Sequence, residues 1–81
     1  MNTYDFRIVR YEGGKLAWMT DSANSYPTRE AAIKAAQDQG EYWSHFHKNA
    51  EFQKTLSGAV LWFIDSEGRR CRTEYKVNEL Q

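Results

Sequence analysis

The stretch from Thr28 to Asn49 constrains the fold of this chain more than any other segment. Pro27 and Thr28 are typical of a helix start, because a threonine hydroxyl can accept a hydrogen bond from an N–H group of the first turn. Alanine, the residue with the highest helix propensity, is frequent just after them. The apolar positions then recur at the helical period and keep their phase past Gly40. We therefore expect one long helix over residues 28–49.

Gly40 is the weak point of this predicted helix. A glycine inside a helix costs about 1 kcal/mol relative to alanine, so a stop at Gly40 followed by a second short helix is the alternative. If the helix is continuous, Gly40 lies within its contact face, where the missing side chain lets two backbones approach closely.

Two segments with strand character precede the helix. Residues 3–11 and 15–20 show the alternation of a β-strand, and Gly13-Gly14 lies between them. Glycine reaches positive φ angles without steric cost, which suits a tight turn between paired strands. These residues therefore predict a β-hairpin.

Two further strand-like segments follow the helix. Residues 59–65 contain a continuous apolar run, which is typical of a central strand covered on both faces. Residues 69–77 alternate between an inner face that includes Cys71 and an outer face of charged side chains. We interpret this last segment as an edge or near-edge strand, because a charged outer face discourages aggregation between edges.

The resulting order is strand, strand, helix, strand, strand, which predicts an α+β fold. Two β-hairpins flank one long helix, and a four-stranded, mainly antiparallel sheet carries the helix on one face. The 81 residues are expected to form a single domain, residues 1–81. A domain of this size needs most of its large side chains in the core. The expected core residues are Phe6, Ile8, Trp18, Ile33, Ala36, Trp43, Val60, Trp62 and Ile64.

Composition argues against several classes of function. The chain has 11 Lys and Arg and 11 Asp and Glu, and residues 1–28, 29–56 and 57–81 are each balanced. Nucleic-acid-binding domains usually carry a basic excess. No apolar run approaches the roughly 20 residues that span a bilayer. The lone cysteine suits a reducing compartment, and the first residues lack the features of a secretory signal. We expect a cytoplasmic protein without membrane attachment.

No motif predicts an enzyme, a metal site or a cofactor. His45 and His47 are two residues apart, so on a helix their side chains would point about 200° apart and could not share an ion. We interpret them as surface histidines near Glu41 and Glu51. Cys71 is expected to be a small buried apolar residue.

The remaining patterns are equally uninformative about catalysis. Gly13-Gly14-Lys15 precedes a strand rather than a helix, so it fits a hairpin turn better than a phosphate-binding loop. No nucleophile elbow of the G-x-S-x-G type occurs in the chain.

The predicted helix carries more apolar surface than one sheet can cover. Its apolar arc spans roughly 200°, whereas packing on a sheet needs about 100°. On one flank Tyr42 and Phe46 are one turn apart, with His45 beside them. This flank is a candidate docking stripe for a protein partner or, as a homodimer through the helix, for a second copy of the chain. The alternative is that residues 51–57 fold back and cover it.

A second candidate surface is the charged side of the last strand. Arg70, Arg72 and Lys76 project to one side, and Arg7 joins them if the first strand lies nearby. Arginines and aromatic rings on a sheet can hold single-stranded nucleic acid, but Glu74 in the same row favours an ordinary solvated face. Arg70 and Arg72 are also candidates for binding an acidic or phosphate-binding surface of a protein partner.

Two short segments carry a resemblance to known families. Tyr26–Ala32 and Trp62–Arg69 resemble the helix start and the second hairpin of small bacterial and phage proteins of unknown function. The segment Tyr42–His47 departs from the shorter helices of those families. The layout is also similar to some phage anti-CRISPR proteins, which are short and carry one helix on a sheet. That resemblance implies binding to a host protein complex and steric occlusion of its nucleic-acid or enzyme contacts.

The combined expectation is a non-enzymatic protein-binding module that uses Tyr42, His45, Phe46, Arg70 and Arg72. In the terms of the resemblance it would be a phage-type inhibitor of a host complex. The alternative is a nucleic-acid-binding domain that uses Arg7, Arg70, Arg72 and Lys76.

Overall fold

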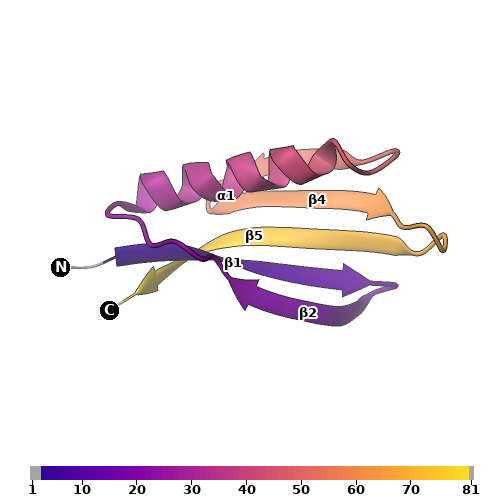
Figure 1. Ribbon diagram of the computed structural model, residues 1–81, viewed down its shortest axis with the longest axis horizontal. Coiled ribbons are helices and arrows are strands. Elements are labelled where there is room, and N and C mark those ends of the chain that lie inside the picture. The colour runs from indigo at the N-terminus through magenta and orange to yellow at the C-terminus, as the bar shows by residue number, and fades with distance from the viewer. Residues whose placement is uncertain (1–2, 81) are drawn as a thin grey trace.

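Five strands pair into one antiparallel sheet, and a single helix lies across one face of that sheet (Figure 1). This computed structural model describes residues 3–80, and the surroundings of side chains up to residue 78. The elements are β1 (Thr3–Glu12), β2 (Lys15–Asp21), α1 (Arg29–Ser44), β3 (Glu51–Thr55), β4 (Gly58–Ile64) and β5 (Arg70–Leu80). The predicted α+β class with one helix is confirmed, but the sheet has five strands instead of four.

β1 and β2 form the predicted hairpin. Its turn uses Gly13 and Gly14, whose φ angles of 59° and 81° favour glycine. The pairing register shifts between Arg10 and Tyr11, so that Arg10 lies opposite Trp18. Residues directly opposite each other project to the same face, and Arg10 and Trp18 therefore share one side of the sheet.

β3 is the strand that the sequence pattern misses. Phe52 is its only large apolar residue, so the segment shows too little alternation to stand out. In the structure it pairs with β4, from Glu51 opposite Trp62 to Thr55 opposite Gly58. The alternative that residues 51–57 fold back and cover Tyr42 and Phe46 is excluded, because both rings are exposed and the backbone of this segment pairs with β4.

β5 lies at the centre of the sheet, in the strand order β2-β1-β5-β4-β3. It pairs with β1 from Thr3 opposite Leu80 to Glu12 opposite Cys71, and with β4 on its other side. The prediction of an edge or near-edge strand is therefore wrong. The charged row of this strand faces an uncovered side of the sheet, and the edges are β2 and β3.

The helix starts as predicted and ends earlier than predicted. The Thr28 side chain accepts a hydrogen bond of 3.1 Å from the Ala31 N–H, which caps the first turn. The helix continues through Gly40, which excludes the alternative of two helices, and it reaches its C-cap at His45. Asn49 then has a φ of 55°, a left-handed conformation that asparagine tolerates, just before the chain enters β3.

Gly40 lies at a point where the helix packs closely on the sheet. A Cβ atom at this position would lie 2.8 Å from Cε1 of Phe52 and 3.2 Å from Cδ2 of Tyr75. The residue is buried, and the predicted close approach of the helix at Gly40 is confirmed. The missing side chain thus lets α1 pack directly on aromatic rings of β3 and β5.

The core lies between α1 and the sheet. It is a cluster of buried residues: Phe6, Ala36, Leu61, Phe63, Cys71 and Tyr75. The predictions for Phe6, Ala36 and the inward-facing Cys71 are confirmed. Ile8, Ile33 and Val60 are half-buried.

Four other predicted core residues are exposed: Trp18 (44%), Trp43 (42%), Trp62 (37%) and Ile64 (48%). Five strands spaced about 4.8 Å apart are wider than one helix of about 10 Å. Part of the sheet face that carries α1 therefore stays uncovered. Trp18 lies in this uncovered part, on the edge strand β2. Trp62 and Ile64 point to the opposite face, so the prediction that β4 is covered on both sides is wrong.

Candidate functional site

Three aromatic side chains gather at the C-terminal end of α1. Tyr42, Trp43 and Phe46 pack on one another, with ring centroids 5.0–5.4 Å apart. Tyr42 is 58% exposed and Phe46 is 61% exposed, as the wide apolar arc of the helix predicts. We call these three residues the aromatic patch. His45, the exposed C-cap residue, lies beside it.

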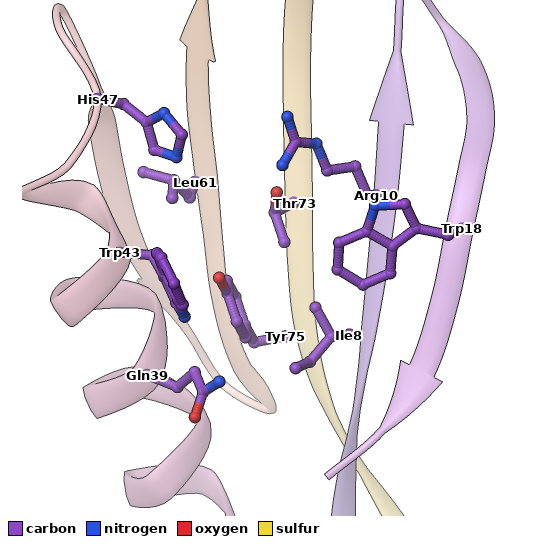
Figure 2. A pocket seen from close by; sticks show the side chains of 9 residues that line it. All are labelled: Ile8, Arg10, Trp18, Gln39, Trp43, His47, Leu61, Thr73 and Tyr75. Carbon is purple, nitrogen blue, oxygen red and sulfur yellow. The ribbon is translucent and has the colours of Figure 1, made fainter. Parts of the chain in front are cut away.

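A groove of about 290 Å³ adjoins the aromatic patch, between α1 and β2 (Figure 2). Trp43 of α1 and Trp18 of β2 stand on its two sides, and residues of β1, β4 and β5 form its floor (Figure 2). We call it the tryptophan groove. It exists because the sheet extends past the helix, and Trp43 joins it to the aromatic patch.

The floor of the groove contains two polar side chains that are almost completely buried. Thr73 and Tyr75 are each 3% exposed, and both line the groove. Among the described residues, the fully buried side-chain polar atoms that lack a hydrogen bond are Asp5 Oδ1 and Arg10 Nε, so the two hydroxyls are not cut off from water. Burial raises the pKa of Tyr75 to about 12, so its hydroxyl keeps its proton and can donate. Because both residues line the groove, their hydroxyls can pair with a bound molecule in place of water.

Arg10 and His47 close one end of the groove against the ring of Phe63. The Arg10 guanidinium carbon lies 4.6 Å from the Phe63 centroid, and the His47 ring stacks on Phe63 at 3.7 Å. Arg10 Nε is 3.2 Å from a Glu12 carboxylate oxygen, but it is buried and the angle does not make a hydrogen bond. The terminal nitrogens of Arg10 point toward the groove (Figure 2).

His47 is therefore not the exposed helical histidine that the sequence predicts. It follows the end of α1, and its stacking on Phe63 leaves it half-buried. Burial and the nearby charge of Arg10 lower the pKa of His47, which favours the neutral ring. In residues 3–80, no three His, Cys, Asp or Glu side chains come together as metal ligands would. The helix that is described lacks the length and apolar character needed to cross a bilayer.

The other face of the sheet carries the predicted cationic residues. Arg7 lies opposite Lys76, which places these two side chains together as expected from neighbouring strands. Arg72 lies between Tyr11 of β1 and Trp62 of β4, with its guanidinium 4.4 Å from the Tyr11 centroid. We call this surface the open face.

Acidic residues neutralise part of the open face. Arg7 forms an ion pair of 3.0 Å with Asp21, and Arg72 forms one of 2.9 Å with Glu74. The balanced charge of the sequence thus also appears locally in the folded sheet.

The expected partner site is split between the two faces. Cys71 and Thr73 point toward the helix, so Arg70 and Arg72, which alternate with them, point to the open face. Tyr42, His45 and Phe46 lie at the end of α1 on the other side of the sheet. A single flat partner surface cannot contact both groups at once.

Sequence reasoning missed the residues that form the tryptophan groove. Trp18 and Trp43 were expected in the core because they are large and apolar, and Arg10 and Tyr75 were not singled out. Arg10, Thr73 and Trp18 meet only through the pairing of β1 with β5 and β2. One available signal is the presence of three Trp in 81 residues, because Trp is large and rarely fully buried.

Comparisons with known proteins leave the family of the chain open. No protein-family model matches it, and no curated protein or solved structure is significantly similar.

Proposed function

We propose that this chain is a non-enzymatic protein-binding module that docks through the aromatic patch. The observation that carries the proposal is the exposure of Tyr42, Trp43 and Phe46, which form a continuous aromatic surface at the end of a helix. Monomeric proteins rarely leave such aromatic clusters in water, and aromatic side chains dominate binding energy at protein interfaces.

The proposed mechanism is steric occlusion. The aromatic patch lies on a helix that is anchored at Gly40 and capped at Thr28, so it is presented without a large ordering cost on binding. A partner surface covered by this end of the molecule would lose access to its other ligands. The resemblance to phage inhibitors suggests that the partner is a component of a host complex.

The test is the double variant Tyr42→Ala/Phe46→Ala. We expect it to lose partner capture from a host lysate, since truncation of a hot-spot aromatic costs about 2 kcal/mol or more of binding free energy. Its circular dichroism spectrum should match that of the wild type, because both rings lie outside the core.

Leu56→Ala provides a matched control. Leu56 is 95% exposed and lies in the β3–β4 turn, away from the aromatic patch. We expect this variant to capture the partner as the wild type does. Equal capture by all three proteins would overturn the proposed function.

A second copy of the chain is the other protein that the aromatic patch could bind. Sedimentation velocity at micromolar concentrations distinguishes the two cases. A dimer that the double variant abolishes would identify the partner as another copy, whereas a monomer leaves a different protein as the partner.

Nucleic-acid binding by the open face is a second candidate, favoured by the position of Arg72 between Tyr11 and Trp62. It predicts oligonucleotide binding that weakens with salt, with a smaller salt dependence in Arg70→Gln/Arg72→Gln. Arg7→Gln and Lys76→Gln should act in the same direction. The absence of binding at about 50 mM salt would exclude it. The ion pairs to Asp21 and Glu74 make this candidate the weaker one.

A further inference from the structure

The tryptophan groove has polar features that an apolar docking surface does not require. Its floor contains the hydroxyls of Thr73 and Tyr75, and each of these two residues is 3% exposed. A bound molecule that supplies hydrogen-bond acceptors can replace water at these hydroxyls.

Arg10 is the charged side chain among the residues that line the groove, since the lowered pKa of His47 and the raised pKa of Tyr75 both favour the neutral groups. The titratable groups that line it are Arg10, His47 and Tyr75, and no carboxylate is among its lining residues. All of these side chains can donate hydrogen bonds. The groove therefore complements an acceptor, and the charge of Arg10 makes an anionic acceptor the best match.

The surroundings of Arg10 indicate a monoanion. Glu12 lies 3.2 Å from its Nε, so one negative charge is already close to the guanidinium. A dianion such as phosphate would be repelled by Glu12, whereas a carboxylate adds a single charge. The terminal nitrogens also suit the two oxygens of a carboxylate, because a guanidinium binds such groups in a fork-like geometry.

The walls of the groove are apolar, so they favour a ligand with an apolar group next to that carboxylate. Trp18 and Trp43 present ring surfaces on its two sides (Figure 2). A volume of about 290 Å³ is at the lower limit of small-molecule sites, which span roughly 300–1,000 Å³. One apolar side chain with an adjacent acidic group fits such a space better than a large cofactor does.

We propose that the tryptophan groove recognises a partner segment in which an apolar side chain stands next to an acidic residue. The apolar side chain lies between Trp18 and Trp43, and the carboxylate binds Arg10 with the hydroxyls of Thr73 and Tyr75. This inference rests on the proposed protein-binding function, because Trp43 belongs to both surfaces and a protein docked on the aromatic patch would reach the groove.

The first test uses the wild-type chain and two capped peptides. Both contain phenylalanine, followed by glutamate in one and by glutamine in the other. We expect the glutamate peptide to bind at least about tenfold more tightly, since a charge-assisted hydrogen bond is worth about 1.5–3 kcal/mol. Binding should shift the indole N–H resonances of Trp18 and Trp43 in NMR spectra. Equal affinities, or shifts confined to Trp62, would overturn the inference.

Variants of the chain then test the roles of Arg10 and Trp18 in peptide binding. Arg10→Gln should remove the preference for glutamate, while Trp18→Ala should weaken both peptides by a similar factor. Arg29→Gln, at the exposed start of α1, is the control and should keep the full preference. Arg10→Lys retains the charge and serves if Arg10→Gln does not fold. A retained glutamate preference in folded Arg10→Gln would refute the assigned role of Arg10.

The two proposals fail in different ways. If Tyr42→Ala/Phe46→Ala abolishes partner capture but the two peptides bind alike, the docking function stands and the groove inference is wrong. If the glutamate peptide is preferred but capture is unaffected by the double variant, the groove inference stands and docking through the aromatic patch is wrong.

Discussion

Phe63 and Phe46 are the same residue type in two opposite environments. Phe63 is buried under the turn that follows α1 and supports both His47 and Arg10. Phe46 is mostly exposed and packs with Tyr42 and Trp43 in the aromatic patch. The difference shows that coverage by α1 and the following turn, and not the apolar character of a side chain, decides burial in this small fold. The covered region holds the fold together, and the uncovered region is available for binding.

The largest expected effect on stability is that of Phe63→Ala, which we compare with Phe46→Ala. Phe63→Ala should lower the free energy of unfolding by about 3–5 kcal/mol, because it leaves a cavity in the core. Phe46→Ala should lower it by less than about 1 kcal/mol. Urea denaturation followed by circular dichroism measures both. Similar losses in the two variants would mean that the aromatic patch is part of the core.

Gly40→Ala tests the covered face of the helix. Alanine favours the helix by about 1 kcal/mol, but overpacking against Phe52 and Tyr75 costs about 1–3 kcal/mol. We expect a net loss of about 1 kcal/mol in the free energy of unfolding. Glu41→Ala, one residue along on the exposed side, should change stability little. A gain in stability from Gly40→Ala would show that the helix does not approach the sheet this closely.

His47 lies between the buried Phe63 and the exposed Phe46 in the sequence, and the pH dependence of stability tests whether it belongs to the covered region. Its pKa is lowered in the folded state by burial and by Arg10, so the unfolded state binds more protons. The stabilisation is complete above the unfolded pKa of about 6.5 and is lost as the pH falls below it.

We expect the melting temperature of His47→Gln to depend less on pH between 7.5 and 5 than that of the wild type. His45→Gln, on the exposed end of the helix, should retain the wild-type dependence. The reverse pattern would place His47 in solvent.

The smallest effect is expected on the solvent side of α1. Lys34 and Asp38 form an exposed ion pair of 3.1 Å, one helical turn apart. Lys34→Ala should change the free energy of unfolding by less than about 0.5 kcal/mol. The change in the free energy of unfolding caused by Lys34→Ala should be nearly the same at low and at high salt. A loss above about 1 kcal/mol would show that this side of the helix has a packing role.

The parts of the fold that depend on local patterns could be predicted from the sequence. The first hairpin follows from Gly13-Gly14, the helix start from Thr28, and the helix contact from the phase around Gly40. The inward position of Cys71 follows from alternation along its strand. Each of these features is encoded within a few residues.

The rest depends on pairing between distant segments. β3 has a single large apolar residue and becomes a strand only because β4 offers it a free edge. The central position of β5 depends on β1, whose sequence contains no sign of that choice. The tryptophan groove was missed for the same reason, since β1, β2, β5 and α1 must all be in place before Arg10 and Tyr75 lie between Trp18 and Trp43.

The central position of β5 also has a consequence for synthesis on the ribosome. β5, which joins the two hairpins, emerges after all the other elements of this sheet, so the β1 edge of the first hairpin and the β4 edge of the second stay unpaired until then. Such edges can pair with those of other nascent chains. A messenger that is truncated before residue 70 would thus produce two halves prone to aggregation, and the cell would have to clear them quickly.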